Sequence, residues 1–286
     1  MKAGTVNSNA SEEERDTVPV PGHFIIGLGR GIGGALLFAL PMQMTMEMWE
    51  LGFSMDRWRL VLLLVVALPL LVGIAHKVGF EETFGWKEDL RDAFIAYGLG
   101  ILTSALVLVL FRLLQPAMPA SEILGKIAIQ AVPSSIGALL GRSQLESAHQ
   151  DSGNDDASYG GELLLMAVGA LFLNLNMAPT EEMILISYKM TDWHALAVVA
   201  LSLVLMHGFV YAVSFKGGHE IEAGTPQWHA FIRFTLPGYV IALLISLYAL
   251  WTFGRLDDVG ATPAIMAMIV LAFPGAIGAA AARLIL

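Results

Sequence analysis

The chain has 286 residues, of which 56% are hydrophobic and only 14% are charged, and it contains no cysteine. A soluble domain carries about 25% charged residues, so the composition indicates a membrane protein. The missing cysteines exclude disulfides, thiolate metal sites and cysteine nucleophiles. The net charge of −9 argues against binding to nucleic acid.

Long apolar runs recur along the chain, and each is long enough to cross a hydrocarbon core of about 30 Å. The runs do not alternate with a period of two residues, which argues against a β-barrel. We predict an all-α, polytopic membrane helix bundle of about eight transmembrane helices. The predicted spans are residues 23–48, 60–76, 92–114, 122–141, 161–178, 194–215, 229–253 and 262–284.

Two polar segments frame these spans. Residues 1–21 are acidic and end in proline, which is typical of a disordered tail. Residues 143–160 form a long polar loop between the fourth and fifth spans. We therefore divide the chain into a four-span unit at 22–142, a linker loop at 143–160 and a second four-span unit at 161–286.

The two units repeat one another in sequence. Gly34 to Trp58 aligns without a gap on Gly169 to Trp193, and ten of the 25 aligned positions are identical. Later matches include Ala93-Phe94-Ile95 with Ala230-Phe231-Ile232, and Pro133, Gly137 and Arg142 with Pro274, Gly278 and Arg283. Since each unit has an even number of spans, both should have the same orientation, related by a pseudo-two-fold axis along the membrane normal.

Basic residues predict the orientation in the membrane. Ten lysines and arginines fall on the side of the N-terminus and six on the opposite side. Because basic residues are enriched in cytoplasmic loops, we expect both termini in the cytoplasm and the repeated glutamates on the outer side.

The most polar block shared by both units follows a long apolar span: Thr45 and Glu47 align on Thr180 and Glu182. Carboxylates at membrane depth are costly and usually face a cavity, a partner or an ion, and rings of acidic residues select cations. We expect an ion-binding site in which Glu47 and Glu182 bind the metal ion and the threonines supply hydroxyl oxygens. The alternative is an interfacial carboxylate that ends a helix in water. Further acidic side chains nearby are Glu50 and Glu181.

Amides and prolines inside the spans add to this hypothesis. Asn174 and Asn176 lie in the fifth span, where they would line a polar path below the glutamate or bond across helices. Prolines inside apolar helices either expose carbonyls to an ion or allow close packing. The predicted kinks are at Pro41, Pro133, Pro179 and Pro274.

The chain also resembles a family of bacterial integral membrane proteins of unknown function, over roughly residues 22–286. The segments that carry the resemblance are Leu40 to Glu47 and Asn176 to Glu182, together with the eight-span layout. The resemblance implies the bacterial inner membrane as the location, and it brings no activity or catalytic residues.

Two classes of function follow from these observations. The first is a channel or transporter for an inorganic cation such as Na⁺, Ca²⁺ or Mg²⁺, which hard oxygen ligands suit. The second is a membrane scaffold or sensor that acts through a partner protein. No zinc-protease motif or serine elbow occurs, so we expect neither an enzyme nor a cofactor. The lipid bilayer is the expected environment, and a homo-oligomer or a membrane partner stays open.

Overall fold

The computed structural model describes residues 21–78, 85–146, 159–214 and 231–285. Nearly all of the expected tail at 1–21, and residues 147–158 of the predicted loop, lie outside the described residues. The described helices are α1 (Pro21–Gln43), α2 (Met46–Ser54), α3 (Arg57–Val78), α4 (Trp86–Leu110), α5 (Ala120–Glu146), α6 (Tyr159–Met177), α7 (Glu181–Lys189), α8 (Asp192–Ser214), the π-helical turn η1 (Phe231–Thr235), α10 (Leu236–Thr252) and α11 (Ala261–Ile285). The fold is all-α, as predicted.

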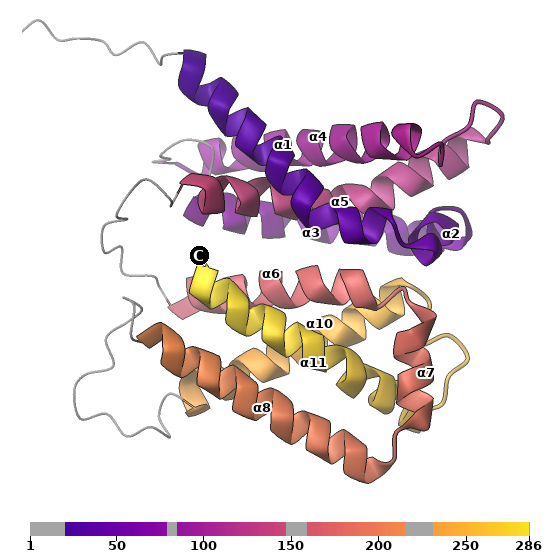
Figure 1. Cartoon of the computed structure of the whole chain (residues 1–286), viewed down its shortest axis with the longest axis vertical. Coiled ribbons are helices and arrows are strands. Elements are labelled where there is room, and N and C mark those ends of the chain that lie inside the picture. Colours follow the sequence, from indigo (N-terminus) through magenta and orange to yellow (C-terminus); the bar gives the residue numbers. More distant parts are fainter. Residues whose placement is uncertain (1–20, 79–84, 147–158, 215–230, 286) are drawn as a thin grey trace, which may run out of the picture.

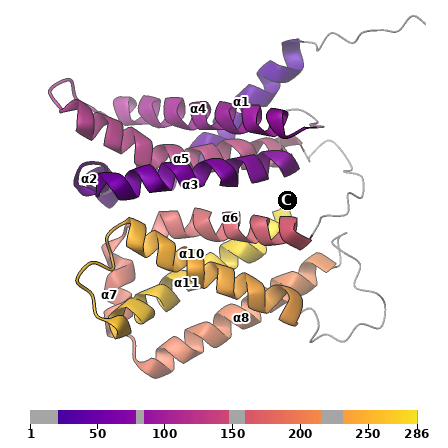
Figure 2. The same cartoon turned by 180° about the vertical axis from the view of Figure 1, so that it is seen from behind.

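The same order of helices occurs twice along the chain. A long helix, a nine-residue helix and three further long helices form residues 21–146, and residues 159–285 follow the same order. We call these two parts the first half and the second half. Corresponding long helices run in the same direction, and the short helices α2 and α7 lie at the same end of the bundle (Figures 1 and 2). We call this the α2/α7 end.

One helix is central in each half. α5 packs against α1, α2, α3 and α4, and α11 packs against the corresponding helices α6, α7, α8 and α10. Glycines permit the closest contacts, because a Cβ on Gly34 would lie under 3.0 Å from backbone atoms of Gly137 and Gly141. A Cβ on Gly169 would meet the Gly278 carbonyl in the same way. The first helix of each half therefore touches the central helix backbone to backbone.

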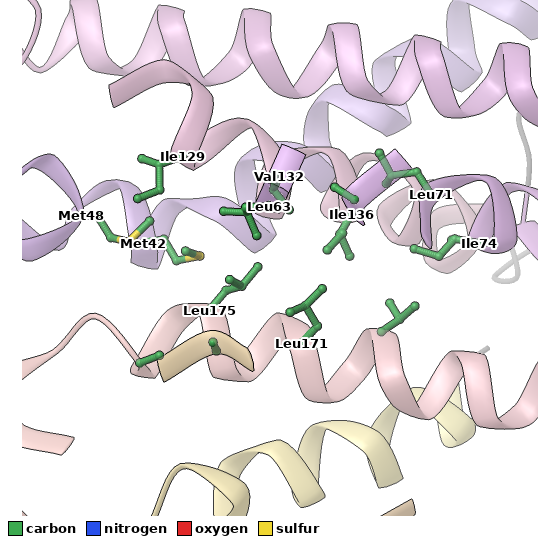
Figure 3. Packing of buried hydrophobic residues seen from close by; sticks show 14 of the residues in the cluster. Met42, Met48, Leu63, Leu71, Ile74, Ile129, Val132, Ile136, Leu171 and Leu175 are labelled. Carbon is green, nitrogen blue, oxygen red and sulfur yellow. The ribbon is translucent and has the colours of Figure 1, made fainter. Parts of the chain in front are cut away.

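The two halves share an apolar core. Side chains of α1, α3 and α5, such as Met42, Leu71 and Ile136, face Leu171 and Leu175 of α6 (Figure 3). All of these side chains are buried. Burial of this apolar surface holds the halves together.

Within the residues that the structure describes, seven helices are long and apolar enough to cross a membrane: α3, α4, α5, α6, α8, η1 with α10, and α11. The first predicted span is not among them. Its helix, α1, contains six glycines, Arg30 and Gln43, and it ends at Gln43 rather than at residue 48. The helix ends two residues after Pro41, and Met44 and Thr45 connect it to α2.

Tryptophans mark the two ends of the bundle. Trp58 and Trp193 are the second residues of α3 and α8 at the α2/α7 end, and Trp86 is the first residue of α4 at the opposite end. All three are more than two-thirds exposed. Such rings are typical of the boundary between lipid and water, and they place the long helices across the bilayer.

Candidate functional site

The repeated threonines act at the turn between a long and a short helix. Thr45 and Thr180 are the residues that directly precede α2 and α7, and both have extended backbone conformations. The Thr45 hydroxyl donates to the Pro41 carbonyl at 2.7 Å, and the Thr180 hydroxyl donates to the Met177 carbonyl at 2.9 Å. Each hydroxyl therefore satisfies a carbonyl at the end of the preceding helix.

The carbonyls of the two turns have further partners. The Trp49 indole Nε1 donates to the Gln43 carbonyl at 2.7 Å, and the Arg255 guanidinium donates to the Pro179 carbonyl. Pro179 lies between α6 and α7, so it ends a helix instead of kinking one. Of the other predicted kink positions, Pro41, Pro133 and Pro274 lie inside helices as expected.

The repeated glutamates start the short helices. Glu47 is half-buried in the first turn of α2, and Glu182 is exposed in the first turn of α7. Within the described part of the chain, no group of three or more His, Asp or Glu side chains could hold a metal ion. The structure thus places the glutamates at one end of the bundle without gathering them into such a group. The neighbouring Glu50 and Glu181 are also exposed.

The two predicted amides of α6 differ in their surroundings. Asn174 is fully buried. With its oxygen towards Ser246, it accepts from the Ser246 backbone and hydroxyl at 3.2 and 2.9 Å and donates to the Leu271 carbonyl at 3.0 Å. We assign this orientation because the reverse one leaves the oxygen facing only acceptors. Asn176 instead donates to the Phe172 carbonyl of its own helix at 2.8 Å. Asn174 therefore forms hydrogen bonds across helices. The two amides do not form a continuous polar path towards Glu182.

A buried polar cluster in the first half was not predicted. Gln43 of α1 lies between Ser104 of α4 and Ser134 of α5, and all three are fully buried. The Gln43 Nε2 donates to the Ser104 and Ser134 hydroxyls at 3.4 and 3.3 Å, and the two hydroxyls lie 2.9 Å apart. The Gln43 Oε1 is buried without a hydrogen-bond partner among the described residues.

The cluster continues along one face of α5 towards the α2/α7 end. Gln130 lies one turn before Ser134 and is fully buried, and neither of its amide atoms meets a partner among the described groups. Lys126 lies one turn earlier and pairs with Glu122, with 2.7 Å between Nζ and Oε1. A spacing of four residues places all four side chains on one face of the helix.

Buried carboxylates lie at the opposite end of the first half. Asp89 and Asp92 are in the first turns of α4, and both are buried. The His76 Nδ1 of α3 lies 2.9 Å from Asp89, and the Arg91 Nε lies 3.4 Å from Asp92. These ion pairs offset part of the cost of burying the carboxylates.

Together, these residues form a polar line along the first half, which we define as Asp92, Ser104, Gln43, Ser134, Gln130, Lys126 and Glu122. Twelve residues of α4 separate Asp92 from Ser104, and twelve of α5 separate Ser134 from Glu122. At 1.5 Å per residue the two stretches add up to about 36 Å, which matches a hydrocarbon core of about 30 Å. Between Asp92 and Ser104 the buried face of α4 carries the small residues Ala96 and Gly100, and at Gly100 α4 packs directly against Ala131 and Ser135 of α5.

The second half lacks this line on its central helix. In the register set by Pro133 and Pro274, the α11 residues that match Lys126, Gln130 and Ser134 are Ala267, Leu271 and Gly275. The sequence therefore did carry a signal: polar residues at four-residue spacing in one unit, with apolar residues at the matching positions of the other.

The fold and this site define a class of protein: a multi-pass, α-helical integral membrane protein with a buried polar line in one half. Residues 27–286 match the family described as "Putative integral membrane protein (DUF2391)". The chain belongs to this family. No curated protein and no solved structure matches it.

Proposed function

We propose that the protein moves an inorganic cation across the membrane along the polar line of the first half. The observation that carries this proposal is the fully buried Gln130, whose amide has no partner among the described residues. Burying an unpaired amide costs about 1–3 kcal/mol by protein mutational data, and an ordinary helix bundle avoids it. A passing cation and the little water that it retains would supply the missing partners.

Carboxylates at both ends of the polar line support a positively charged solute. Glu122 lies at the α2/α7 end, and Asp89 and Asp92 lie at the opposite end. Acidic residues at the mouths of a path raise the local concentration of cations. On this proposal, Glu47 and Glu182 attract cations to the α2/α7 end rather than binding one tightly.

The proposal also includes the membrane in which the protein lies and its orientation there. The start of α1 and the end of α11 lie at the end opposite α2 and α7 (Figure 1). Because the basic residues favour that side, we place both termini in the cytoplasm of a bacterium and the α2/α7 end outside the inner membrane. We further propose that the two halves arose from one duplicated four-span unit.

A scaffold or sensor is the second candidate. One observation favours it: Glu181 and Glu182 are exposed on α7, and the Thr180 hydroxyl is already bonded to a helix carbonyl. On this reading α7 presents a charged surface to a partner protein, and the polar line is a structural feature alone.

Ion flux into liposomes separates the two candidates. Purified protein in liposomes is expected to pass at least one of K⁺, Na⁺, Mg²⁺ or Ca²⁺ faster than protein-free liposomes do. The double variant Glu47→Gln, Glu182→Gln should slow this flux at low ionic strength and approach wild type at high salt, since surface charge is screened over about 8 Å at physiological salt. Wild-type protein that passes none of the four ions would reject transport and leave the scaffold.

A further inference from the structure

We infer that Gln43, Gln130, Ser134 and Ser104 form one central binding site for a monovalent, largely dehydrated cation, and that the described part of the second half has no matching site. The inference rests on the proposed transport function, and it adds the place of the site and the class of ion. The site lies where α1, α4 and α5 meet, about halfway along the polar line.

Unpaired oxygen atoms mark the site. The Oε1 atoms of Gln43 and Gln130 are buried acceptors without a partner among the described residues. Gln130 and Ser134 share one face of α5 at a spacing of one helical turn, and Ser134 bonds directly to Gln43. Gln43, Ser104 and Ser134 are in hydrogen-bond contact, and Gln130 lies one helical turn from Ser134, about 5.4 Å along the axis of α5. A cation coordinated by these oxygens would offset the desolvation cost that they now carry.

The absence of net charge at the site selects the class of ion. All four side chains are neutral. The nearest charged residue along α5 is Lys126, one turn from Gln130, and its ammonium pairs with Glu122 on the side away from Gln130. Ca²⁺ and Mg²⁺ are typically bound with carboxylates, which repay the large cost of removing their water. Neutral oxygens can replace the hydration shell of a monovalent ion such as K⁺.

The described part of the second half lacks the residues that would form a matching site. The α11 residues matching Gln130 and Ser134 are Leu271 and Gly275. Asn174 lies against Gly275, but hydrogen bonds to Ser246 and Leu271 satisfy its amide. A fold that packs with Leu271 at this position does not need an amide there for stability, so Gln130 serves another purpose.

Replacing Gln130 with the residue of the other half is the sharpest test. Gln130→Leu should lower K⁺ or Na⁺ flux into liposomes about tenfold or more, the equivalent of one hydrogen bond to a charged group. Its melting temperature should stay equal to wild type or rise, because an unpaired buried amide is removed. The matched control is Ser202→Ala on α8, which removes a buried hydroxyl of the second half that donates to the Val198 carbonyl of its own helix. This control should keep wild-type flux.

Two further variants keep the inference testable if Gln130→Leu does not fold. Ser134→Ala should also lower monovalent flux. Gln130→Glu should add passage of Mg²⁺ or Ca²⁺, since it supplies the missing negative charge. Wild-type protein that passes Mg²⁺ as fast as K⁺ would overturn the monovalent class. Folded Gln130→Leu with wild-type flux would overturn the site while leaving transport itself in place. No flux in the wild type would reject both.

Discussion

Arg59 of α3 and Asp257 of the α10–α11 connection form a bidentate ion pair between the two halves. The Nη1–Oδ2 distance is 2.8 Å and the Nη2–Oδ1 distance is 2.7 Å. The guanidinium also lies over the Trp251 ring, 5.0 Å from its centre. Hydrogen bonding from Arg59 is the main cause that lowers the pKa of Asp257 below its ordinary value. The ion pair therefore fixes the halves at the α2/α7 end, where the shared apolar core ends.

Replacing Asp257 should loosen this connection in a pH-dependent way. The lowered pKa means that the pair contributes fully above the ordinary carboxyl pKa of about 3.9, and that the contribution is lost as the pH falls through the folded value. Asp257→Asn should cost about 0.5 kcal/mol at pH 7, because its side chain is half exposed and exposed pairs contribute little. Thermal unfolding at pH 7 and in acid measures the difference, which should vanish in acid. Asp258→Asn is the control and should unfold like wild type at both pH values.

The glycine contacts predict a matched pair of destabilising variants. A Cβ at Gly34 or at Gly169 would clash with backbone atoms of the central helix. Gly34→Ala and Gly169→Ala should each lower stability by about 1–3 kcal/mol, the usual cost of overpacking. Gly98→Ala on α4 is the control, since nothing lies within 4 Å of its added methyl group. Unfolding temperatures in detergent provide the measurement. Equal unfolding temperatures for all three variants would show that the close backbone contacts at Gly34 and Gly169 can open without loss of stability.

Removing the Thr45 hydroxyl should lower the stability of the protein without changing its selectivity between K⁺ and Na⁺. Thr45→Val removes the donor to the Pro41 carbonyl and should cost about 1 kcal/mol. The ratio of K⁺ to Na⁺ flux should stay the same, because the hydroxyl is already used by the helix. Thr45→Ser retains the hydroxyl and serves as the control. An altered flux ratio with unchanged stability would instead assign the threonine to the ion path.

Much of the fold could be predicted from apolar runs, because seven of the eight expected spans correspond to helices long enough to cross a membrane. The semi-polar stretch that follows Pro179 forms the short helix α7. Its counterpart α2 was missed, because Met46 and Met48 continue the apolar run of α1 without a visible boundary. The end of α4 at Leu110 was also not predictable. The residue with a positive φ that follows it is Arg112 (57°), and not the glycine that usually marks the end of a helix.

The site was harder to predict, because the residues that are repeated between the two units are those that the fold itself requires. Thr45 and Thr180 recur in sequence and have the same role at the ends of helices. Gln130 does not recur. Its neighbours in the polar line come from positions far apart in the chain, as the hydrogen bond from Gln43 to Ser134 illustrates. Only tertiary packing brings these residues together.

Water access to the polar line is the central claim, and the natural absence of cysteine allows a direct measurement. Ser134→Cys and Ala276→Cys each place one thiol in a fully buried position, the first on α5 and the second on α11. In liposomes, a small water-soluble thiol reagent should modify Ser134→Cys, and K⁺ should slow the reaction. Ala276→Cys should stay unmodified. Equal protection of both thiols, or equal reaction of both, would contradict a path confined to the first half.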